Sequence, residues 1–324
     1  MDIAAYIQSP IVEELDNFKQ MFDQSLQSST PLLTEVTTYI RQRKGKMMRP
    51  VLILLMAKLY GKIQPATYHA AVSLELLHTA SLLHDDVVDE SCERRGQDSV
   101  NEAFNNKIAV LVGDYLLATC LLEAEKTHIH HIIETVSRLG QHLAEGEILQ
   151  ISDQSDQLLS EKVYYEVIRK KTAALFGACT RAAALSVGSG MEDVDKATRF
   201  GEYIGLCFQI RDDIFDYYDN SGIGKATHHD MLERRLTLPI LYAINSTNDE
   251  WAKATALKVK EGEATADEME ELTRFAKEHG GIEYAQNIMK ANRQEAYNLI
   301  AGFPESDTKK SLIAYLDYVI DRKK

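Results

Sequence analysis

Two clusters of aspartates, 127 positions apart, are the residues in this 324-residue sequence whose types and spacing most suggest chemistry. Each cluster reads Asp-Asp-x-x-Asp. On a helix, the first and last aspartates of such a motif lie about 40° apart on one face, while the middle one lies to the side. The six carboxylates are Asp85, Asp86 and Asp89 in the first cluster, and Asp212, Asp213 and Asp216 in the second.

The first cluster follows a run of apolar residues that includes Leu76, Leu77 and Leu83, so its acids lie at the mouth of a buried region. His78 falls on the same helical stripe as Asp85. Acidic side chains near a helix C-terminus are disfavoured by the helix dipole, so something should offset them. A single motif of this kind could be a solvated acidic helix end, but the second copy argues against that interpretation.

The second cluster also ends an apolar stretch, and Gln209 shares its polar stripe at the i, i+3, i+4, i+7 spacing. Carboxylate oxygens suit a hard cation, and no cysteine–histidine pattern for zinc is near. Mg²⁺ prefers one or two carboxylates together with waters and substrate phosphates. The two clusters therefore predict a diphosphate held through several Mg²⁺ ions.

Basic residues follow or flank these motifs and could complete a diphosphate site. Any one of them, taken alone, is most often a solvated surface charge, but their placement favours the binding role. They are Lys46 and Arg49 in KGKMMRP, Arg94 and Arg95 after the first cluster, Lys171 (followed by the polar Thr172) in a largely apolar helix, and Lys225 in GIGKA.

The elements that must position these residues are predicted to be helices. The chain has only 17 glycines and 6 prolines, too few for a protein built of many hairpins. Apolar residues recur at helical spacing and no strand pattern is found. The first expected helix begins at Pro10, and the region from Pro239 to Lys324 is also expected to be helical. Between them, the expected helices cover residues 31–40, 50–61, 65–90, 101–126, 128–152, 160–189 and 192–219. We expect one all-α domain over residues 1–324.

The net charge of −13 disfavours nucleic acid as a partner, and it requires metal ions or a local basic patch for any anionic ligand. Four cysteines without a paired pattern indicate a reduced, cytoplasmic protein. The N-terminus does not resemble a signal peptide, and the longest apolar run, Val51 to Ala57, is too short to span a bilayer. Without a basic amphipathic anchor, we expect at most transient membrane contact.

Taken together, these motifs resemble those of the trans-isoprenyl diphosphate synthase (polyprenyl synthetase) family, long-chain type. The resemblance covers nearly the whole chain. It is carried by KGKMMRP, ELLHTASLLHDDVVDESCERRG, GDYLLA, KKTAALF, GLCFQIRDDIFDY, GKATHHD and LTLP.

The resemblance implies a bundle of long, mostly antiparallel helices around a central cavity, and a homodimer. It implies that the aspartates bind Mg²⁺, with two ions at the first motif and one at the second. The implied isopentenyl diphosphate ligands are Lys46, Arg49, His78 and Arg95. The implied allylic diphosphate ligands are Arg94, Lys171, Thr172, Gln209 and Lys225, with Arg235 also binding substrate.

Three departures from the family pattern stand out. The family usually reads GGKRxRP, where this chain has Lys44 for the first glycine and Met47 for the first arginine. His228 stands where a glycine is usual, and Arg235 replaces a lysine while keeping its charge. These departures concern loop closure and isopentenyl affinity more than the chemistry.

The expected reaction is Mg²⁺-dependent condensation of isopentenyl diphosphate onto an allylic diphosphate, with farnesyl or geranylgeranyl diphosphate as primer. Short-chain relatives have bulky aromatics four or five residues before the first aspartate. Here those positions are small, so we expect a hexaprenyl to octaprenyl product, such as a quinone side-chain precursor. The residues of this chain-length pocket are Ala80 and Ser81, then Leu77, Ser73 and Leu74. The alternatives are a farnesyl or geranylgeranyl synthase, a class I terpene cyclase, and a non-catalytic helical subunit.

Overall fold

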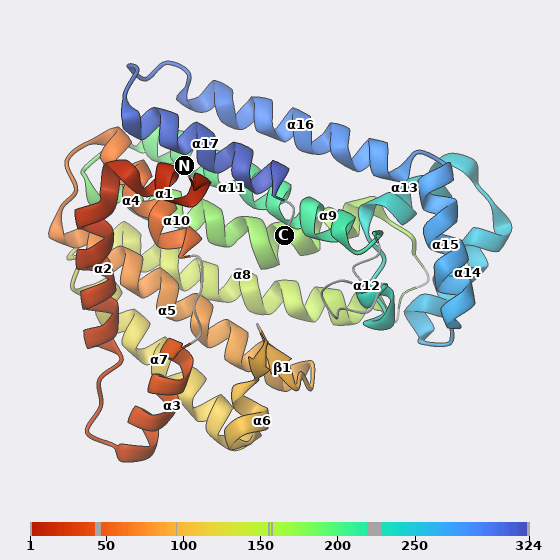
Figure 1. Ribbon diagram of the computed structural model, residues 1–324, viewed down its shortest axis with the longest axis horizontal. Helices are drawn as coiled ribbons and strands as arrows, with labels where there is room; N and C mark the ends of the chain where they lie inside the picture. Colours follow the sequence, from red (N-terminus) through yellow and green to blue (C-terminus); the bar gives the residue numbers. More distant parts are fainter. Residues whose placement is uncertain are drawn as a thin grey trace. The chain divides into compact units, whose positions relative to one another are not determined.

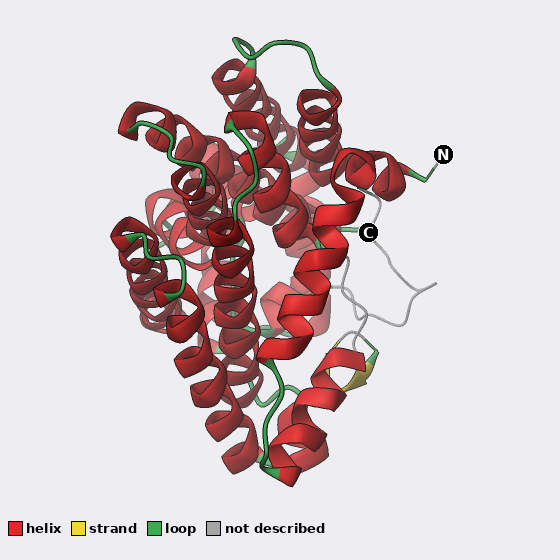
Figure 2. Ribbon diagram, turned by 90° about the vertical axis from the view of Figure 1, so that its left-hand side faces the viewer, coloured by secondary structure: helices red, strands yellow, loops and turns green. Residues whose placement is uncertain are grey.

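The computed structural model describes residues 2–42, 47–94, 96–154, 156, 158–218 and 228–322. These residues are helical almost throughout, as predicted, with one short antiparallel ribbon drawn in yellow (Figure 2). The ribbon was not predicted, and it pairs Glu93 with Asp98 and Arg94 with Gln97. It lies inside the loop that follows the first aspartate cluster, and so it fixes the position of Arg94.

The α-helices and β1 are labelled in Figure 1. In the first half of the chain they are α1 Ile3–Gln8, the 3₁₀ turn η1 Ser9–Ile11, α2 Val12–Ser25, α3 Pro31–Gln42, α4 Met48–Tyr60, α5 Pro65–Val88, β1 Glu93–Arg94, β2 Gln97–Asp98, α6 Val100–Phe104, α7 Asn106–Glu125 and α8 His130–Gln154. In the second half they are α9 Glu161–Ile168, the π-helical turn η2 Arg169–Ala173, α10 Ala174–Ser186, α11 Met191–Phe215, α12 His229–Leu232, α13 Leu238–Thr247, α14 Glu250–Glu261, α15 Ala266–Glu278, α16 Gly281–Ile300 and α17 Asp307–Asp321.

The chain divides into two compact units. The first comprises residues 1–141, 175–201 and 299–315, and the second comprises residues 142–174, 202–298 and 316–324. The first aspartate motif belongs to the first unit and the second motif to the second unit. The single domain over residues 1–324 stays a prediction.

The first unit is built around α4, α5 and α7. Every residue of α4 from Pro50 to Ala57 is buried, as its uniformly apolar sequence predicts. Helix α5 begins at Pro65, preceded by a capping box in which the Gln64 backbone N–H donates to the Thr67 hydroxyl over 3.1 Å. It runs without interruption to the first aspartate motif, and this rigid, buried helix therefore fixes where that motif lies.

Helices α5 and α7 run antiparallel and in close contact (Figure 1). Near one end His69 Nδ1 lies 2.7 Å from Glu123 Oε2, and further along the Ser73 hydroxyl donates to the Cys120 carbonyl over 3.0 Å. Near the other end the His84 ring lies against Gly113, where an added Cβ would come within 2.3 Å of Nε2. A glycine at this position is what allows the two helices to approach so closely.

Candidate active site

The three aspartates of the first motif, at the C-terminal end of α5, have different surroundings. Asp86 is buried and accepts a 2.5 Å charge-assisted hydrogen bond from Arg94 Nε. Asp85 is half-buried and Asp89 is exposed, one turn apart on the same face. The ribbon thus returns Arg94 to the helix end, where its positive charge offsets the unfavourable position of the acids. The prediction that all three aspartates bind metal stays untested, but the structure gives Asp86 a partner within the protein.

Two predicted isopentenyl ligands of the first unit lie on neighbouring helices. Arg49, in the first turn of α4, forms an ion pair with Glu75 of α5 over 3.3 Å, and both side chains are largely buried. His78 is half-buried one turn further along α5. Sequence reasoning missed Glu75, although it precedes His78 by three residues and so shares its helical face. Lys46 and Arg95, also predicted here, lie outside the described residues.

The residues proposed to set chain length occupy two environments on α5. Ala80 and Leu74 are fully buried, Leu77 is almost so, and the Ser73 hydroxyl is engaged in the contact with α7. Ser81 is only half-buried, and its hydroxyl donates to the His78 carbonyl within the same helix. Of the two small residues before the motif, Ser81 is therefore the less buried one.

The second motif is tied to two other elements of its unit by a chain of hydrogen bonds. Thr172 in η2 donates to Gln209 Oε1 over 2.7 Å, and Gln209 Nε2 donates to Asp213 Oδ1 over 2.8 Å. The Tyr164 hydroxyl of α9 donates to the other Asp213 oxygen over 2.5 Å. Asp213 is thus buried and occupied by protein donors, as Asp86 is in the first motif.

The outer aspartates of the second motif have different surroundings. Asp216 accepts the backbone N–H groups of His229 (2.9 Å) and Asp230 (3.1 Å), at the start of α12. Asp212 Oδ1 lies 2.6 Å from Arg322 Nη2, and its side chain is 43% exposed. Both residues are bonded within the protein, but they are half-buried whereas Asp213 is buried.

Among the residues that the structure describes, no three carboxylate, histidine or cysteine side chains gather closely enough to enclose a metal ion. A Mg²⁺ ion does not need such a cage, because it takes one or two carboxylates and completes its coordination with waters and phosphate oxygens. Asp85 with Asp89, and Asp212 with Asp216, offer pairs of hard oxygen donors one turn apart. These residues fit a cation that binds together with its phosphate ligand.

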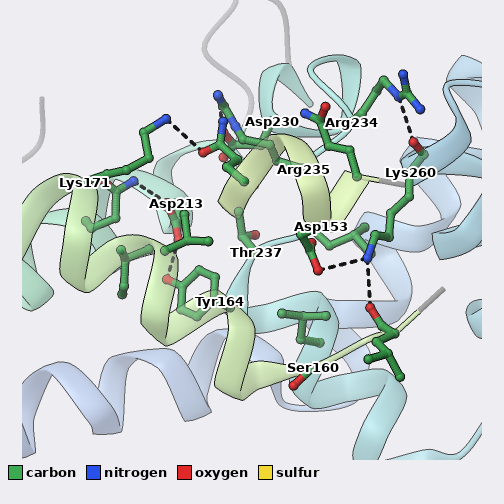
Figure 3. A pocket seen from close by; sticks show the side chains of 18 of the residues that line it. Asp153, Ser160, Tyr164, Lys171, Asp213, Asp230, Arg234, Arg235, Thr237 and Lys260 are labelled. Atoms are coloured by element: carbon green, nitrogen blue, oxygen red, sulfur yellow. Dashed lines mark hydrogen bonds and ion pairs between the residues drawn. The ribbon is translucent and has the colours of Figure 1, made fainter. Parts of the chain in front are cut away.

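A cavity of about 210 Å³ lies beside the second motif (Figure 3). Its lining brings together five residues predicted from the sequence, namely Lys171, Thr172, Gln209, Asp213 and Arg235. Lys171 contacts Glu147 (2.5 Å) and Gln150 (3.1 Å), so its ammonium is held by α8. Lys225 lies outside the described residues.

Further charged or polar residues of this cavity were missed, among them Asp230, Tyr164, Lys260 and Asp153. Asp230 forms an ion pair with Arg235 over 2.9 Å, and Tyr164 holds Asp213. Lys260, 2% exposed, contacts Asp153 over 3.2 Å and donates to the Leu158 carbonyl. Asp230, in the predicted GKATHHD motif, could have been recognised from the sequence. The others come from distant helices and carried no such signal.

Burial raises the pKa of Asp213 to about 8, and the neighbouring negative charge of Asp230 adds to this effect. The folded protein therefore favours the protonated carboxyl, whose stabilising contribution is complete below the ordinary pKa and is lost as pH rises through about 8. In EDTA, we expect the melting temperature to fall between about pH 4 and pH 8, the interval between the ordinary and the raised pKa, and to fall less in D213N. D114N, which alters an exposed aspartate, is the control. If the melting temperature of D213N depends on pH as steeply as that of the wild type and of D114N, the prediction is wrong.

The π-helical turn that carries Lys171 and Thr172 depends on two glycines. A Cβ at Gly205 of α11 would lie 2.5 Å from the Ala173 Cα, and one at Gly146 of α8 would lie 2.8 Å from the Lys171 Cγ. The absence of these side chains lets α8 and α11 pack directly against η2. π-turns are frequent at functional sites because they shift the register of the following side chains.

Replacing Gly205 with alanine should destabilise the protein by about 1–3 kcal/mol, because the added methyl meets backbone atoms that cannot rotate away. Urea unfolding measures the change. Gly140, also within a helix, has open space around its Cα, so G140A should leave stability unchanged or raise it by up to about 1 kcal/mol. Equal stabilities of the two variants would refute the packing argument.

No helix within the described part of the chain is long and apolar enough to cross a membrane. All four cysteines are free thiols, three of them buried.

Comparisons with known proteins agree with this picture. The polyprenyl synthetase family model matches residues 30–275. The chain is 36% identical to octaprenyl diphosphate synthase of Haemophilus influenzae over 299 residues, which cover 92% of this chain and 90% of the relative. Its fold matches the crystal structure of geranylgeranyl pyrophosphate synthase from Bacteroides thetaiotaomicron with a TM-score of 0.87 and 54% identity, covering 99% and 100% of the two chains.

A third match bears on the ligands. Polyprenyl synthase from Caulobacter crescentus, solved with calcium and isoprenyl diphosphate, has a TM-score of 0.90 and 28% identity, covering 99% of this chain and 98% of its own. The family is Mg²⁺-dependent and uses isoprenyl diphosphate substrates. Its members are prenyltransferases, and the relatives include synthases of long polyprenyl chains. The chain belongs to the polyprenyl synthetase family.

Proposed function

We propose that this protein is a trans-polyprenyl diphosphate synthase that condenses isopentenyl diphosphate head-to-tail onto an allylic diphosphate. One observation carries the proposal most directly. Each aspartate motif buries its middle carboxylate against protein donors, whereas the outer pairs, Asp85 with Asp89 and Asp212 with Asp216, lie one turn apart and are partly or fully exposed. Two such pairs suit a diphosphate bound through Mg²⁺.

In this proposal three Mg²⁺ ions, two at the first motif and one at the second, would neutralise the charge of the leaving diphosphate. Lys171, Arg94 and Lys225 add positive charge on the allylic diphosphate, and Thr172 and Gln209 orient it. Arg49, with Lys46, His78 and Arg95, holds isopentenyl diphosphate, and Glu75 keeps the Arg49 guanidinium in place. Arg235, braced by Asp230, contributes further positive charge beside the second motif.

Departure of the diphosphate leaves an allylic cation, which the isopentenyl double bond attacks. Loss of a proton, taken up by the released diphosphate, then completes the condensation. The apolar helix walls exclude water that would otherwise trap the cation.

The small residues Ala80 and Ser81 support a long product, hexaprenyl to octaprenyl, extended from farnesyl or geranylgeranyl diphosphate and suited to a quinone side chain. The 54% identity to a protein described as a geranylgeranyl pyrophosphate synthase supports a second candidate, a shorter-chain synthase. Both candidates share the same reaction and differ in where elongation stops.

One assay separates these possibilities. The protein is incubated with Mg²⁺, farnesyl diphosphate and labelled isopentenyl diphosphate, and the dephosphorylated products are sized by reversed-phase chromatography. Extended linear chains support the synthase, and their length decides between the two candidates. A cyclic hydrocarbon without isopentenyl incorporation would indicate a terpene cyclase, and no turnover a non-catalytic subunit.

The exposed face of α7 supports the proposal of a homodimer. Leu111, Leu121 and Leu122 are between 51% and 63% exposed, on the side of the helix away from α5. A second copy of the chain would cover this apolar stripe, as exposed apolar clusters commonly require.

Replacing both Leu111 and Leu122 with aspartate should therefore weaken dimerisation at least about 30-fold, the effect expected for central apolar contacts of an interface. Sedimentation equilibrium measures the dissociation constant. V12D alters an equally exposed apolar residue on α2 and should leave the dimer intact. A wild-type protein that is monomeric, or a dimer that resists the double substitution, would refute this interface.

A further inference from the structure

The C-terminal end of α17 lies directly on the second aspartate motif. Arg322 donates from Nη2 to Asp212 Oδ1 over 2.6 Å and to the Phe208 carbonyl over 3.0 Å. Its guanidinium lies 3.8 Å from the centre of the Phe208 ring, and its side chain is only 13% exposed. A cation is thus stacked on α11 at the carboxylate proposed to take a metal.

The motif itself also holds this arginine in place. Arg211, the residue before Asp212, donates from Nε (3.3 Å) and Nη2 (3.1 Å) to the Arg322 carbonyl. The Arg211 guanidinium in turn lies 4.7 Å from the centre of the Phe215 ring. Because Phe208, Arg211, Asp212 and Phe215 share one face of α11, the whole contact is built on the helix that carries the motif.

The contact is nevertheless incomplete. Arg322 Nε is buried and makes no hydrogen bond with any residue in the described ranges. A buried donor without a partner lowers the stability of the arrangement that contains it. Asp212, by contrast, keeps 43% of its side chain exposed and remains within reach of a second cation. The guanidinium and a divalent ion would compete for the same carboxylate.

We propose that Arg322 is a positioning residue of the second metal site, which holds the Asp212 carboxylate until a divalent cation displaces its guanidinium. This inference rests on the proposed role of Asp212 as a Mg²⁺ ligand. Arg322 neutralises the negative charge of Asp212 while no metal is bound. When a divalent cation replaces the guanidinium, the cation neutralises this carboxylate instead, so Asp212 has a positive partner with and without metal. Metal affinity is consequently set in part by how firmly α17 holds Arg322.

The test measures Mn²⁺ binding to the full-length protein by electron paramagnetic resonance, without isoprenoid substrate and with or without inorganic pyrophosphate. R322Q should bind Mn²⁺ about fivefold or more tightly than the wild type, the range of a direct coupling between two ligands. In the D212N background the same substitution should change nothing, which separates the second site from the first. R293Q is the matched control, because it breaks a different arginine–carboxylate pair that involves α17, the one between Arg293 of α16 and Asp317 of α17, and should not alter affinity.

A second readout is thermal stability. R322Q should melt below the wild type in EDTA, and Mn²⁺ should raise its melting temperature by more than it raises that of the wild type. If R322Q fails to fold, R322K keeps the charge without the forked donor and should show the same changes in smaller measure. Equal or weaker Mn²⁺ binding in R322Q, or equal tightening in R293Q, overturns the proposal. Prenyl transfer by the wild type decides the proposed function separately, because these titrations need no substrate turnover.

Discussion

Replacing Asp85 with asparagine should slow prenyl transfer by about a hundred- to a thousandfold while the protein stays folded. Asparagine keeps the size and polarity of the side chain but not the negative charge that holds a hard cation. Asp85 is half-buried at the end of α5, beside the exposed Asp89. The loss should therefore fall on the rate of the reaction and on the Mg²⁺ concentration that it requires, as measured by incorporation of labelled isopentenyl diphosphate over a Mg²⁺ titration.

The neighbouring residue offers a sharp control. Asp86 is buried and bonded to Arg94, so D86N should cost about 2 kcal/mol of stability by weakening a buried charge-assisted bond. We expect its Mg²⁺ requirement to change much less than that of D85N. The exposed-site variant D16N should change neither quantity. A D85N protein within tenfold of the wild-type rate (well short of the expected loss), or a D86N protein with the larger Mg²⁺ effect, would contradict the division of roles within the motif.

Replacing Ser81 with phenylalanine should shorten the product made from farnesyl diphosphate to geranylgeranyl length. Ser81 is half-buried, and its hydroxyl donates to the His78 carbonyl within the same helix, so we expect an aromatic ring to be accommodated there. In the proposed chain-length pocket, a ring at that level would block the growing chain one turn below the first motif. Chromatography of dephosphorylated products, with farnesyl diphosphate as primer, measures the change.

Ala80 is the less suitable position for this experiment. It is fully buried one turn before His84, whose ring lies against α7, so A80F should also overpack the α5–α7 contact at a cost of about 1–3 kcal/mol. S81A serves as the control and should leave product length unchanged. A wild-type product distribution from a well-folded S81F would rule out this position as the floor of the pocket. If the wild type already makes a short product, the small residues do not set chain length at all.

Most of the helices could be predicted from the sequence, because apolar periodicity and the positions of proline are local features that indicate where a helix begins and which face it buries. The predicted helix at 65–90 is α5, and the helix at 192–219 corresponds to α11, Met191–Phe215. The helix predicted at 160–189 is present, but it contains the π-turn η2, which shifts the register at Lys171 and Thr172. That departure depends on packing against glycines of α8 and α11, which no local pattern reveals.

The sequence by itself determined the kind of chemistry and the helices that carry it, since residue types and local spacing are properties of the chain. Only the tertiary structure decided which carboxylates of each motif are left accessible. Asp213 is buried by Tyr164, 49 positions away, and Asp212 is met by Arg322, 110 positions away. A pattern of five residues treats its three aspartates nearly alike. Contacts with residues distant in sequence distinguish the aspartates, because the burial and the partners of a side chain depend on which residues pack against it in the folded protein.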